Sequence, residues 1–354
     1  MSPASEPNKF TTHPPAAGHE TAGRLVELLR AAGDGFVSGS RLGRELKVSR
    51  TAVWKHIKAL ESEGYGIVTH PRHGYRLAHA PEALHPREVA SALSSRWLGS
   101  RMVVWQSVDS TNRAAMEDAG LGHGAVVAAL CQPSGRGRLG RTWNSPPGSL
   151  PFSVVLSPGI PLEHMQTVTL ATALGLAQGI EAATGVRVGI KWPNDLIWEG
   201  RKLAGILTEA RSDPDRVVRS VVGVGLNVTT RTDDFPPELQ ARAASLEMAG
   251  GRDISASSLL AALLNALEPV YDAVLSAGRA GRDAVDVMHA YRERCITLGR
   301  TVTVSGASGQ PIYGEAVEVD ATGALWIRPE GCEPIRVLSG DVTLNPDGLA
   351  EAGR

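Results

Sequence analysis

Residues 135–141 read Gly135-Arg136-Gly137-Arg138-Leu139-Gly140-Arg141, and this stretch decides how the rest of the chain is interpreted. Glycines separate three guanidinium groups. Glycine lets backbone N–H groups approach a ligand closely, and a guanidinium group offers a rigid fork of donors to a phosphate or a carboxylate. The stretch therefore predicts a pliable loop that binds a ligand with several negatively charged oxygens.

The three glycines also match the dinucleotide-binding pattern G-x-G-x-x-G. That pattern requires a helix that opens at the third glycine and an acidic residue about 20 positions later. Residues 142–148 include two prolines and cannot continue a helix, and no Asp lies between Asp118 and Asp195. We therefore reject this match and favour an anion-binding loop between strands. The alternatives are a solvated basic turn and an RNA-binding Arg/Gly segment.

Size and composition limit the class of protein. The 354 residues suffice for two or three domains, and a 42% hydrophobic content suffices for a core. The net charge of −1 gives no global attraction to nucleic acid, but residues 22–80 hold ten Lys/Arg against five Asp/Glu. Cys131, Cys295 and Cys332 lack the spacing of a disulfide framework or a zinc site, which suits a reducing cytoplasm. We see no signal peptide, and the apolar run over 167–180 is too short to span a bilayer.

The first 80 residues predict a disordered tail and a small helical domain. Residues 1–21 are rich in Pro, Ser, Thr and Ala, which is typical of disorder. Helices are expected from Leu25, over 38–46 and over 49–63, with Ser49 as N-cap. A strand–turn–strand hairpin over 67–77 follows. Three helices and a hairpin form a winged helix-turn-helix, which we assign to residues 22–80.

A linker at 81–86 leads into mixed strands and helices, assigned as a catalytic domain over 86–296. Helices are predicted over 86–93, 165–184, 255–275 and 283–294, and strands over 103–106, 125–131, 152–156, 186–191 and 217–227, with a hairpin over 196–209. Residues 297–346 alternate β-branched runs with glycine turns, which predicts a small β-barrel before a tail at 347–354.

Three further motifs accompany the loop: Lys191-Trp192-Pro193-Asn194-Asp195-Leu196, Arg201-Lys202-Leu203-Ala204-Gly205-Ile206 and Gly223-Val224-Gly225-Leu226-Asn227. Gly223 and Gly225 occupy alternate positions of a predicted strand and so share one face. Two missing side chains there would leave a groove for a flat ligand. Singly, each motif could be a plain turn or a crowded strand; together they favour a binding site.

With Ser110-Thr111-Asn112 and the loop that ends at Trp143, these motifs occur in the order found in biotin–protein ligases, which the chain resembles. The winged helix extends the resemblance, over roughly residues 22–345, to the bifunctional form that also represses the biotin operon. The resemblance implies an α+β protein: a winged helix-turn-helix domain, a class II synthetase-like mixed α/β catalytic domain and a small SH3-like β-barrel.

The resemblance also implies a reaction in two steps. Biotin and MgATP give biotinyl-5'-AMP and pyrophosphate; a lysine of a biotin carboxyl carrier protein, from acetyl-CoA carboxylase or a related carboxylase, then takes the biotin and releases AMP. Like charges about 4 Å apart repel by about 4 kcal/mol at an effective dielectric near 20, so the carboxylate and the phosphates need nearby cations. Arg136, Arg138, Arg141 and Lys202 are suited to this role.

The resemblance assigns residues to each ligand. The expected catalytic groups are Lys202, Arg136 and Arg138. Biotin is expected at Ser110, Thr111, Asn112, Gln132, Gly135, Arg136, Gly137, Arg138, Lys202, Gly205, Ile206, Gly223 and Gly225. ATP or the adenylate is expected at Arg138, Arg141, Trp143, Asn194, Asp195, Lys202 and Asn227. Asp195 holds Mg²⁺ or, with Asn194, orients Lys202. A packed core position is the alternative for Trp143, and Phe235 is a candidate to stack on adenine.

The helix predicted over 49–63 would read a DNA operator. Its polar face carries Ser49, Arg50, Thr51, Lys55 and Lys58, and Arg72 lies at the hairpin tip. A charged solvent face is the alternative. We expect a homodimer, because a bound adenylate would order the glycine-rich loops, and no membrane association. One rival is a lipoyl or octanoyl transferase, which lacks this loop. Others are a ligase whose winged helix does not repress and a non-enzymatic biotin-responsive repressor, which would have lost the Arg and Lys groups.

Overall fold

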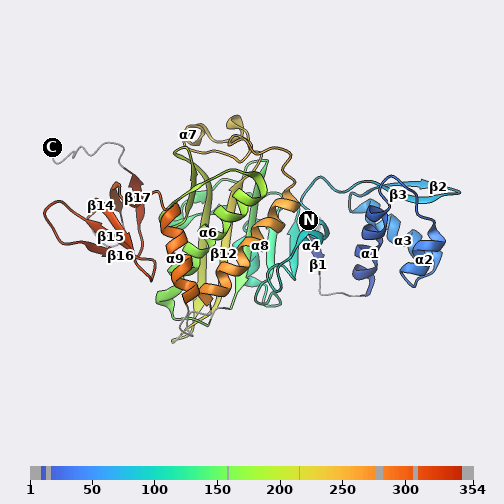
Figure 1. Ribbon diagram of the computed structural model, residues 1–354, viewed down its shortest axis with the longest axis horizontal. Coiled ribbons are helices and arrows are strands. Elements are labelled where there is room, and N and C mark those ends of the chain that lie inside the picture. The colour runs from blue at the N-terminus through green and yellow to red at the C-terminus, as the bar shows by residue number, and fades with distance from the viewer. Residues whose placement is uncertain are drawn as a thin grey trace, which may run out of the picture.

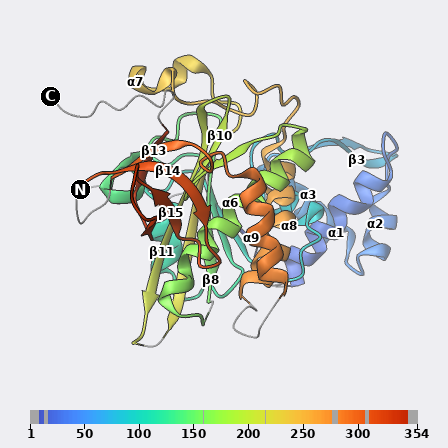
Figure 2. The ribbon, with the colours of Figure 1, turned by 60° about the vertical axis from the view of Figure 1, so that its left-hand side comes forward.

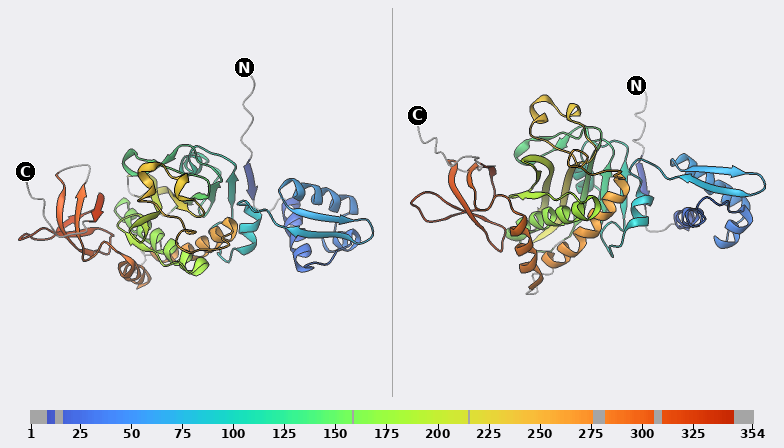
Figure 3. Two further views of the ribbon diagram at one scale, coloured as in Figure 1. Left: turned by 90° about the horizontal axis from the view of Figure 1, so that it is seen from above. Right: turned by 45° about the horizontal axis from the view of Figure 1, so that its top comes forward.

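The computed structural model describes residues 9–12, 17–157, 159–214, 216–275, 282–305 and 310–344. Figure 1 shows three bodies in a row: a blue helical domain, a central domain built on a large sheet, and a red β-sheet domain. The views in Figure 3 agree that the first and the last lie at opposite ends of the central domain. This arrangement confirms the predicted fold class.

The N-terminal domain is a winged helix-turn-helix. It consists of α1 (Ala17–Ala31), α2 (Gly39–Glu45), α3 (Arg50–Ser62), β2 (Gly66–His70) and β3 (Gly74–His79). Ser49 caps α3 as predicted, because its side chain accepts a hydrogen bond from the N–H of Ala52 at 3.1 Å. Val53, Ile57 and Leu60 recur on one side of α3 and enter a core of their own. The opposite side of α3 is left to solvent.

The central domain is an eight-stranded sheet with helices on both faces (Figure 2). The strand order is β1 (Lys9–Thr12), β4 (Met102–Trp105), β5 (Val126–Ala129), β8 (Ser149–Leu156), β12 (Val217–Asn227), β11 (Arg201–Ser212), β10 (Asp195–Trp198) and β9 (Gly189–Lys191). Pairing is antiparallel except between β4 and β5. The helices are α4 (Pro86–Ala92), α5 (Thr111–Glu117), α6 (Met165–Thr184), α7 (Pro237–Gln240), α8 (Ala256–Leu275) and α9 (Arg282–Arg294).

Alternation along the strands divides the apolar side chains between two cores. Val104 and Val126 face the large core under α6 and α8, whereas Val103 and Val127 face a small core with α5. α8 is long and apolar enough to cross a membrane, but it packs against α6 and most of its apolar window is buried. Its Glu268 also accepts hydrogen bonds from the backbone N–H groups of segment 96–98. α8 therefore occupies the position of a core helix.

The C-terminal domain is a five-stranded sheet in the order β16 (Ile335–Val337), β15 (Leu325–Arg328), β14 (Ile312–Val319), β13 (Thr301–Ser305) and β17 (Asp341–Leu344). Its buried side chains are continuous with the large core of the central domain. Trp192 donates from Nε1 to the carbonyl of Gly323 at 2.9 Å, and Arg292 donates to the carbonyl of Val319 at 2.7 Å. The two domains are therefore packed as one unit.

The structure corrects two predictions and adds one helix. Within the tail predicted to be disordered, residues 9–12 form β1 and residues 17–21 begin α1. β1 pairs with β4, whose backbone groups would otherwise lie at the sheet edge, and composition alone carries no sign of such a distant pairing. The strand predicted over 186–191 is limited to 189–191, and α5 was not predicted. By contrast, α6 and β12 have the predicted bounds.

Charged groups join the winged helix to the central domain. Arg30 on α1 contacts both carboxylate oxygens of Glu88 on α4, at 2.7 and 3.0 Å. The Tyr65 hydroxyl donates to the same carboxylate at 2.7 Å, and burial raises the pKa of Tyr65. Arg87 on α4 pairs with Glu63 at 3.1 Å. This junction is polar, unlike the apolar contact with the C-terminal domain.

His85 makes this junction sensitive to pH. It is 4% exposed, with Nε2 3.6 Å from a Glu63 carboxylate oxygen. Burial lowers its pKa below the ordinary 6.5, although Glu63 opposes this effect. Below that pH the unfolded chain binds a proton that the folded protein resists, so the contribution of His85 to stability is full above pH 6.5 and falls as the pH drops.

We expect His85→Gln to flatten the fall in stability between pH 7 and pH 5, a component of at most about 1.4 kcal/mol per pH unit. Urea unfolding at several pH values measures it. His289→Gln, at an exposed position, is the control and should keep the wild-type profile. Parallel profiles for His85→Gln and the wild type would contradict the assignment.

Candidate active site

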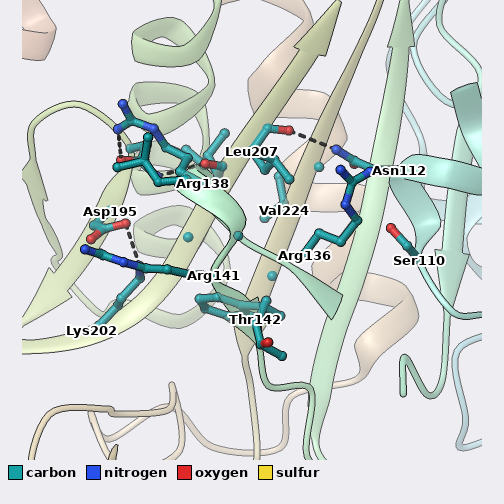
Figure 4. A pocket seen from close by; sticks show the side chains of 18 of the residues that line it. Ser110, Asn112, Arg136, Arg138, Arg141, Thr142, Asp195, Lys202, Leu207 and Val224 are labelled. Atoms are coloured by element: carbon teal, nitrogen blue, oxygen red, sulfur yellow. Dashed lines mark hydrogen bonds and ion pairs between the residues drawn. The ribbon is translucent and has the colours of Figure 1, made fainter. Parts of the chain in front are cut away.

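One pocket gathers nearly all of the predicted binding residues. It lies between β11 and β12, the loop over 135–143 and the C-terminal domain, and encloses about 820 Å³ with its open mouth. Among the predicted ligand-binding residues, all except Gly135, Asn227 and the adenine-stacking candidate Phe235 line it. Sequence reasoning missed Leu139, Thr142, Leu207, Val224, Gly340 and Asp341. Figure 4 shows the charged side chains of the pocket on both sides of the loop.

A buried polar network forms one end of the pocket. Ser110 caps α5, and the next residue, Thr111, donates from its N–H to Oε1 of Gln132 at 2.9 Å. The Ser153 hydroxyl on β8 lies 2.8 Å from the Thr111 hydroxyl and 2.7 Å from Oδ1 of Asn112. These five side chains are at most 7% exposed. Because buried polar groups are costly unless they are paired, this network fixes the positions of its members.

The strand glycines have a different role from the one predicted. A Cβ at Gly223 would lie 2.0 Å from Oδ1 of Asn112, and one at Gly225 would lie 2.2 Å from the indole of Trp143. Neither distance is possible, so a larger residue would displace these side chains. Both glycines line the pocket, as predicted, but part of the space that they leave is filled by protein side chains. The glycines make room for Asn112 and Trp143, which themselves line the pocket.

The loop is short and structured. It consists of β6 (Gly135–Arg136), a 3₁₀ turn at Arg138–Gly140, and β7 (Thr142–Trp143), which pairs with β6. Leu139 has a φ of 54°, a left-handed conformation that is strained for a non-glycine residue. Leu139 is also 63% exposed. An exposed apolar side chain on a strained turn indicates a segment with few contacts of its own.

Arg136 and Arg138 are held by groups from outside the loop. Arg136 pairs with Glu209 on β11 at 3.1 Å, and Nδ2 of Asn112 donates to the same carboxylate at 2.8 Å. Arg138 donates to Oδ1 of Asn194 at 2.8 Å. Burial lowers the pKa of Arg138, although the charge of Asp195 opposes this effect. Asn194 therefore positions Arg138 and not Lys202, contrary to one predicted alternative.

Arg141 connects the loop to the C-terminal domain. It donates to Oδ2 of Asp341 at the start of β17 at 2.6 Å. This hydrogen bond lowers the pKa of Asp341 and raises that of Arg141, and the charges of Lys191 and Lys202 lower the pKa of Asp341 further. No sequence motif indicated Asp341, because its position depends on the packing of a separate domain.

Lys202 lies opposite the loop. Its ammonium group pairs with Asp195 at 2.7 Å and lies 5.4 Å from the ring centre of Trp143, within the range of a cation–π contact. Asp195 thus orients Lys202, as one predicted alternative held. Trp143 is half-buried, and its Nε1 is buried without a hydrogen-bond partner in the described part of the chain. A hydrogen-bond acceptor on a ligand could pair with this Nε1–H group.

Three predicted positions lie outside the pocket. Asn227 is buried and donates to the carbonyl of Ala244 at 3.0 Å, so it joins the end of β12 to the following segment. Gly135 lies behind the pocket wall, where a Cβ would meet the carbonyl of Trp143 at 2.3 Å. Phe235 is 4% exposed and does not line the pocket. None of the three lines the pocket.

The predicted metal ligand is Asp195, and the structure adds a second carboxylate to the pocket, that of Asp341. Asp195 and Asp341 both line the pocket, and each is paired with a cation. Within the described residues no group of three or more His, Cys, Asp or Glu side chains could hold a metal ion. Magnesium usually enters such sites on one or two carboxylates together with substrate phosphates, so these residues fit a nucleotide-borne Mg²⁺ better than a resident ion.

The predicted DNA-binding residues lie on α3 and at the tip of the hairpin. Arg50, Thr51 and Lys55 are exposed, as is Arg72. Lys58 is exposed as well but pairs with Glu61 at 2.6 Å. The Ser49 side chain is engaged as the helix cap. The face is therefore basic and open to solvent.

Comparisons with known proteins agree with this architecture. Residues 104–227 match the biotin/lipoate A/B protein ligase family, and residues 23–76 match a helix-turn-helix domain. The chain thus combines a ligase domain with a DNA-binding type of domain. It is 35% identical over 324 residues to the bifunctional ligase/repressor BirA of Bacillus subtilis, which covers 90% of this chain and 97% of the relative. The chain therefore belongs to the family of bifunctional ligase/repressors.

Two further relatives support the ligase part. The biotin–[acetyl-CoA-carboxylase] ligase of Mycobacterium tuberculosis is 31% identical over 256 residues, covering 67% of this chain and 89% of the relative. The structure of the biotin protein ligase from Aquifex aeolicus in complex with biotin and ATP has a TM-score of 0.58 at 27% identity. That similarity covers 69% of this chain and 98% of the other.

We predict that Gly225→Ala lowers the free energy of unfolding by about 1–3 kcal/mol, because the new methyl group clashes with Trp143. In a Trp143→Ala background the same substitution should cost much less, since the clashing ring is gone. Urea denaturation of the four proteins of this cycle measures the coupling. Gly122→Ala, where a Cβ meets nothing within 4 Å, is the control. Equal costs in both backgrounds would refute the contact.

Proposed function

We propose that this protein activates biotin with ATP to biotinyl-5'-AMP and transfers the biotin to a lysine of a biotin carboxyl carrier protein. The observation that carries the proposal is the convergence of four cationic side chains on one pocket beside a buried polar network. Arg136, Arg138, Arg141 and Lys202 supply positive charge where a carboxylate must meet phosphate oxygens. The network has the hydrogen-bonding groups that a small polar ring requires.

In this proposal biotin lies across the floor of the pocket. The ureido ring contacts Ser110, Thr111 and Gln132, which the Ser153 hydroxyl and α5 hold in place. The valeryl tail runs along Gly205 and Ile206 toward Lys202. Trp143 covers the neighbouring part of the sheet and offers its Nε1 proton. Because these groups are ordered by protein contacts, little reorganisation precedes binding.

The protein oxygens that now hold the cations are the groups that the substrates replace. Glu209, Asp195 and Asp341 each neutralise one cation. The biotin carboxylate and the α-phosphate take over Lys202 and the arginines, so the cations stay paired throughout. Asp195, with Asp341 beside it in the pocket, would hold a Mg²⁺ that accompanies ATP, and that ion would neutralise phosphate charge.

Two bonds change in each step. A biotin carboxylate oxygen forms a bond to the α-phosphorus, while the bond from that phosphorus to the bridging oxygen breaks and pyrophosphate leaves. The neutral amine of the carrier lysine then attacks the acyl carbon, loses a proton to solvent, and AMP leaves. Arg136, Arg138 and Lys202 stabilise the charge that develops on phosphate oxygens in the first step.

We expect Lys202→Gln to lower kcat/KM for carrier biotinylation by about 10²–10³-fold, the usual effect of losing one charge-stabilising donor. Intact mass of a biotin-carrier domain incubated with biotin and MgATP measures it. Lys55→Gln, on the winged helix, is the matched control and should leave ligation unchanged. Lack of any mass increase with the wild-type protein would refute the ligase assignment.

The same protein is proposed to repress transcription through its winged helix and to act in the cytoplasm as a homodimer. The three free cysteines fit a reducing compartment. For the dimer, β11 extends beyond the residues that contact β10 and Asn194, so segment 208–212 offers a strand edge to a second chain. The alternative is a ligase whose winged helix does not repress.

We expect biotin plus MgATP to shift the protein from monomer to dimer, because a bound adenylate adds contacts to the loop over 135–143, which has few of its own. Sedimentation velocity with both ligands, with biotin alone and without ligand provides the measurement. Arg138→Gly, which loses the hydrogen bond to Asn194, should weaken the shift. A sedimentation coefficient that is the same in all three conditions would contradict the coupling.

A further inference from the structure

Trp54 is the large apolar side chain that α3 exposes. It is 51% exposed, and it is the one tryptophan among the large hydrophobic residues that are exposed in the described chain. Arg50 lies one turn before it and Lys58 one turn after it, so the three side chains share a stripe. Tryptophan is highly buried on average, and an exposed one between two cations is uncommon unless something covers it.

Contacts within the domain do not explain the exposure. Phe36, the other exposed aromatic ring of the winged helix, packs against His70 at 5.7 Å and lies under the Arg76 guanidinium at 5.6 Å. Trp54 has no such ring or cation partner in the described part of the chain. Its own helix neighbour Val53 is fully buried, so Trp54 lies outside the core stripe.

The charged residues around Trp54 indicate what kind of molecule binds this surface. Arg50 and Lys55 are exposed and form no ion pair among the described residues, whereas Lys58 is balanced by Glu61. A surface that combines an apolar ring with unpaired cations is complementary to the major groove of DNA. There, phosphates line both rims and the C5-methyl groups of thymine form the apolar part of the floor.

We propose that Trp54 reads thymine in the operator through an apolar contact with its C5-methyl group, while Arg50 and Lys55 bind the flanking phosphates. The position fits, because residues in the first turns of a recognition helix are those that reach base edges. This inference rests on DNA binding by the winged helix and adds the residue that gives it sequence preference.

The test starts from a pool of random 30-bp duplexes and full-length protein with biotin and MgATP. After selection, the enriched duplex is compared with a scrambled one by fluorescence anisotropy at several salt concentrations. We expect Trp54→Ala to weaken binding of the enriched duplex by about 5–150-fold, to leave the scrambled duplex nearly unaffected, and to keep the salt slope. Lys55→Gln, the contrasting variant, should weaken both duplexes alike and reduce the slope by about one unit.

Replacing thymidine by deoxyuridine in the enriched duplex removes only the methyl group. At one such position deoxyuridine should weaken the complex with the wild-type protein but have little further effect on the complex with Trp54→Ala. Trp54→Phe should restore part of the preference for thymine that Trp54→Ala loses. Because the winged helix has a core of its own, unchanged helical circular dichroism and urea unfolding of each variant show that this domain is folded.

The outcomes separate the inference from its premise. If the wild-type protein enriches no duplex, DNA binding itself fails, and this inference with it. If a duplex is enriched but deoxyuridine or Trp54→Ala has no selective effect, only the role of Trp54 is overturned. If Trp54→Ala changes the sedimentation coefficient and not DNA binding, Trp54 contacts a second copy of this chain and the proposal is wrong.

Discussion

A loop that carries three guanidinium groups within seven residues repels itself, and the structure depends on how that repulsion is relieved. Each arginine is held by an oxygen from a different element: Glu209 on β11, Asn194 after β9 and Asp341 on β17. Lys202 has its own partner in Asp195. The cations therefore stand at fixed positions around one pocket. Anionic substrates can exchange with these oxygens without leaving any cation unpaired in a partly buried site.

The firm packing of the C-terminal domain places Asp341 beside Arg141. Its sheet shares one apolar core with the central domain, and Trp192 is anchored to Gly323 across the boundary. An apolar core fixes the distance between domains, and a carboxylate that must meet Arg141 requires such precision. The winged helix is joined instead by charged and polar groups around Glu88. Polar contacts exchange readily with water, so they suit the winged helix, which lies at the opposite end of the molecule from the C-terminal domain.

Much of this organisation could be predicted from the sequence. Helical periodicity predicted α6, the residue type of Ser49 predicted the N-cap of α3, and strand alternation predicted β12, because these depend on neighbours along the chain. The motifs also located most of the pocket. The glycines were misinterpreted: their spacing indicated missing side chains, but nothing local indicated that Asn112 and Trp143 fill the space. β1 could not be predicted for the same reason, because its partner strand β4 lies about ninety residues away.

The sequence by itself determined which groups the protein has for binding anions, since Gly/Arg spacing and a strand-borne lysine are local facts. It also determined the three-part order of the chain, which periodicity reveals. Only the tertiary structure decided which oxygen each cation meets, that Asn227 turns away from the pocket, and that Asp341 belongs to it. The reason is physical: charge and periodicity are properties of short segments, whereas pairing between side chains up to 200 positions apart is settled by how the sheets and their cores pack.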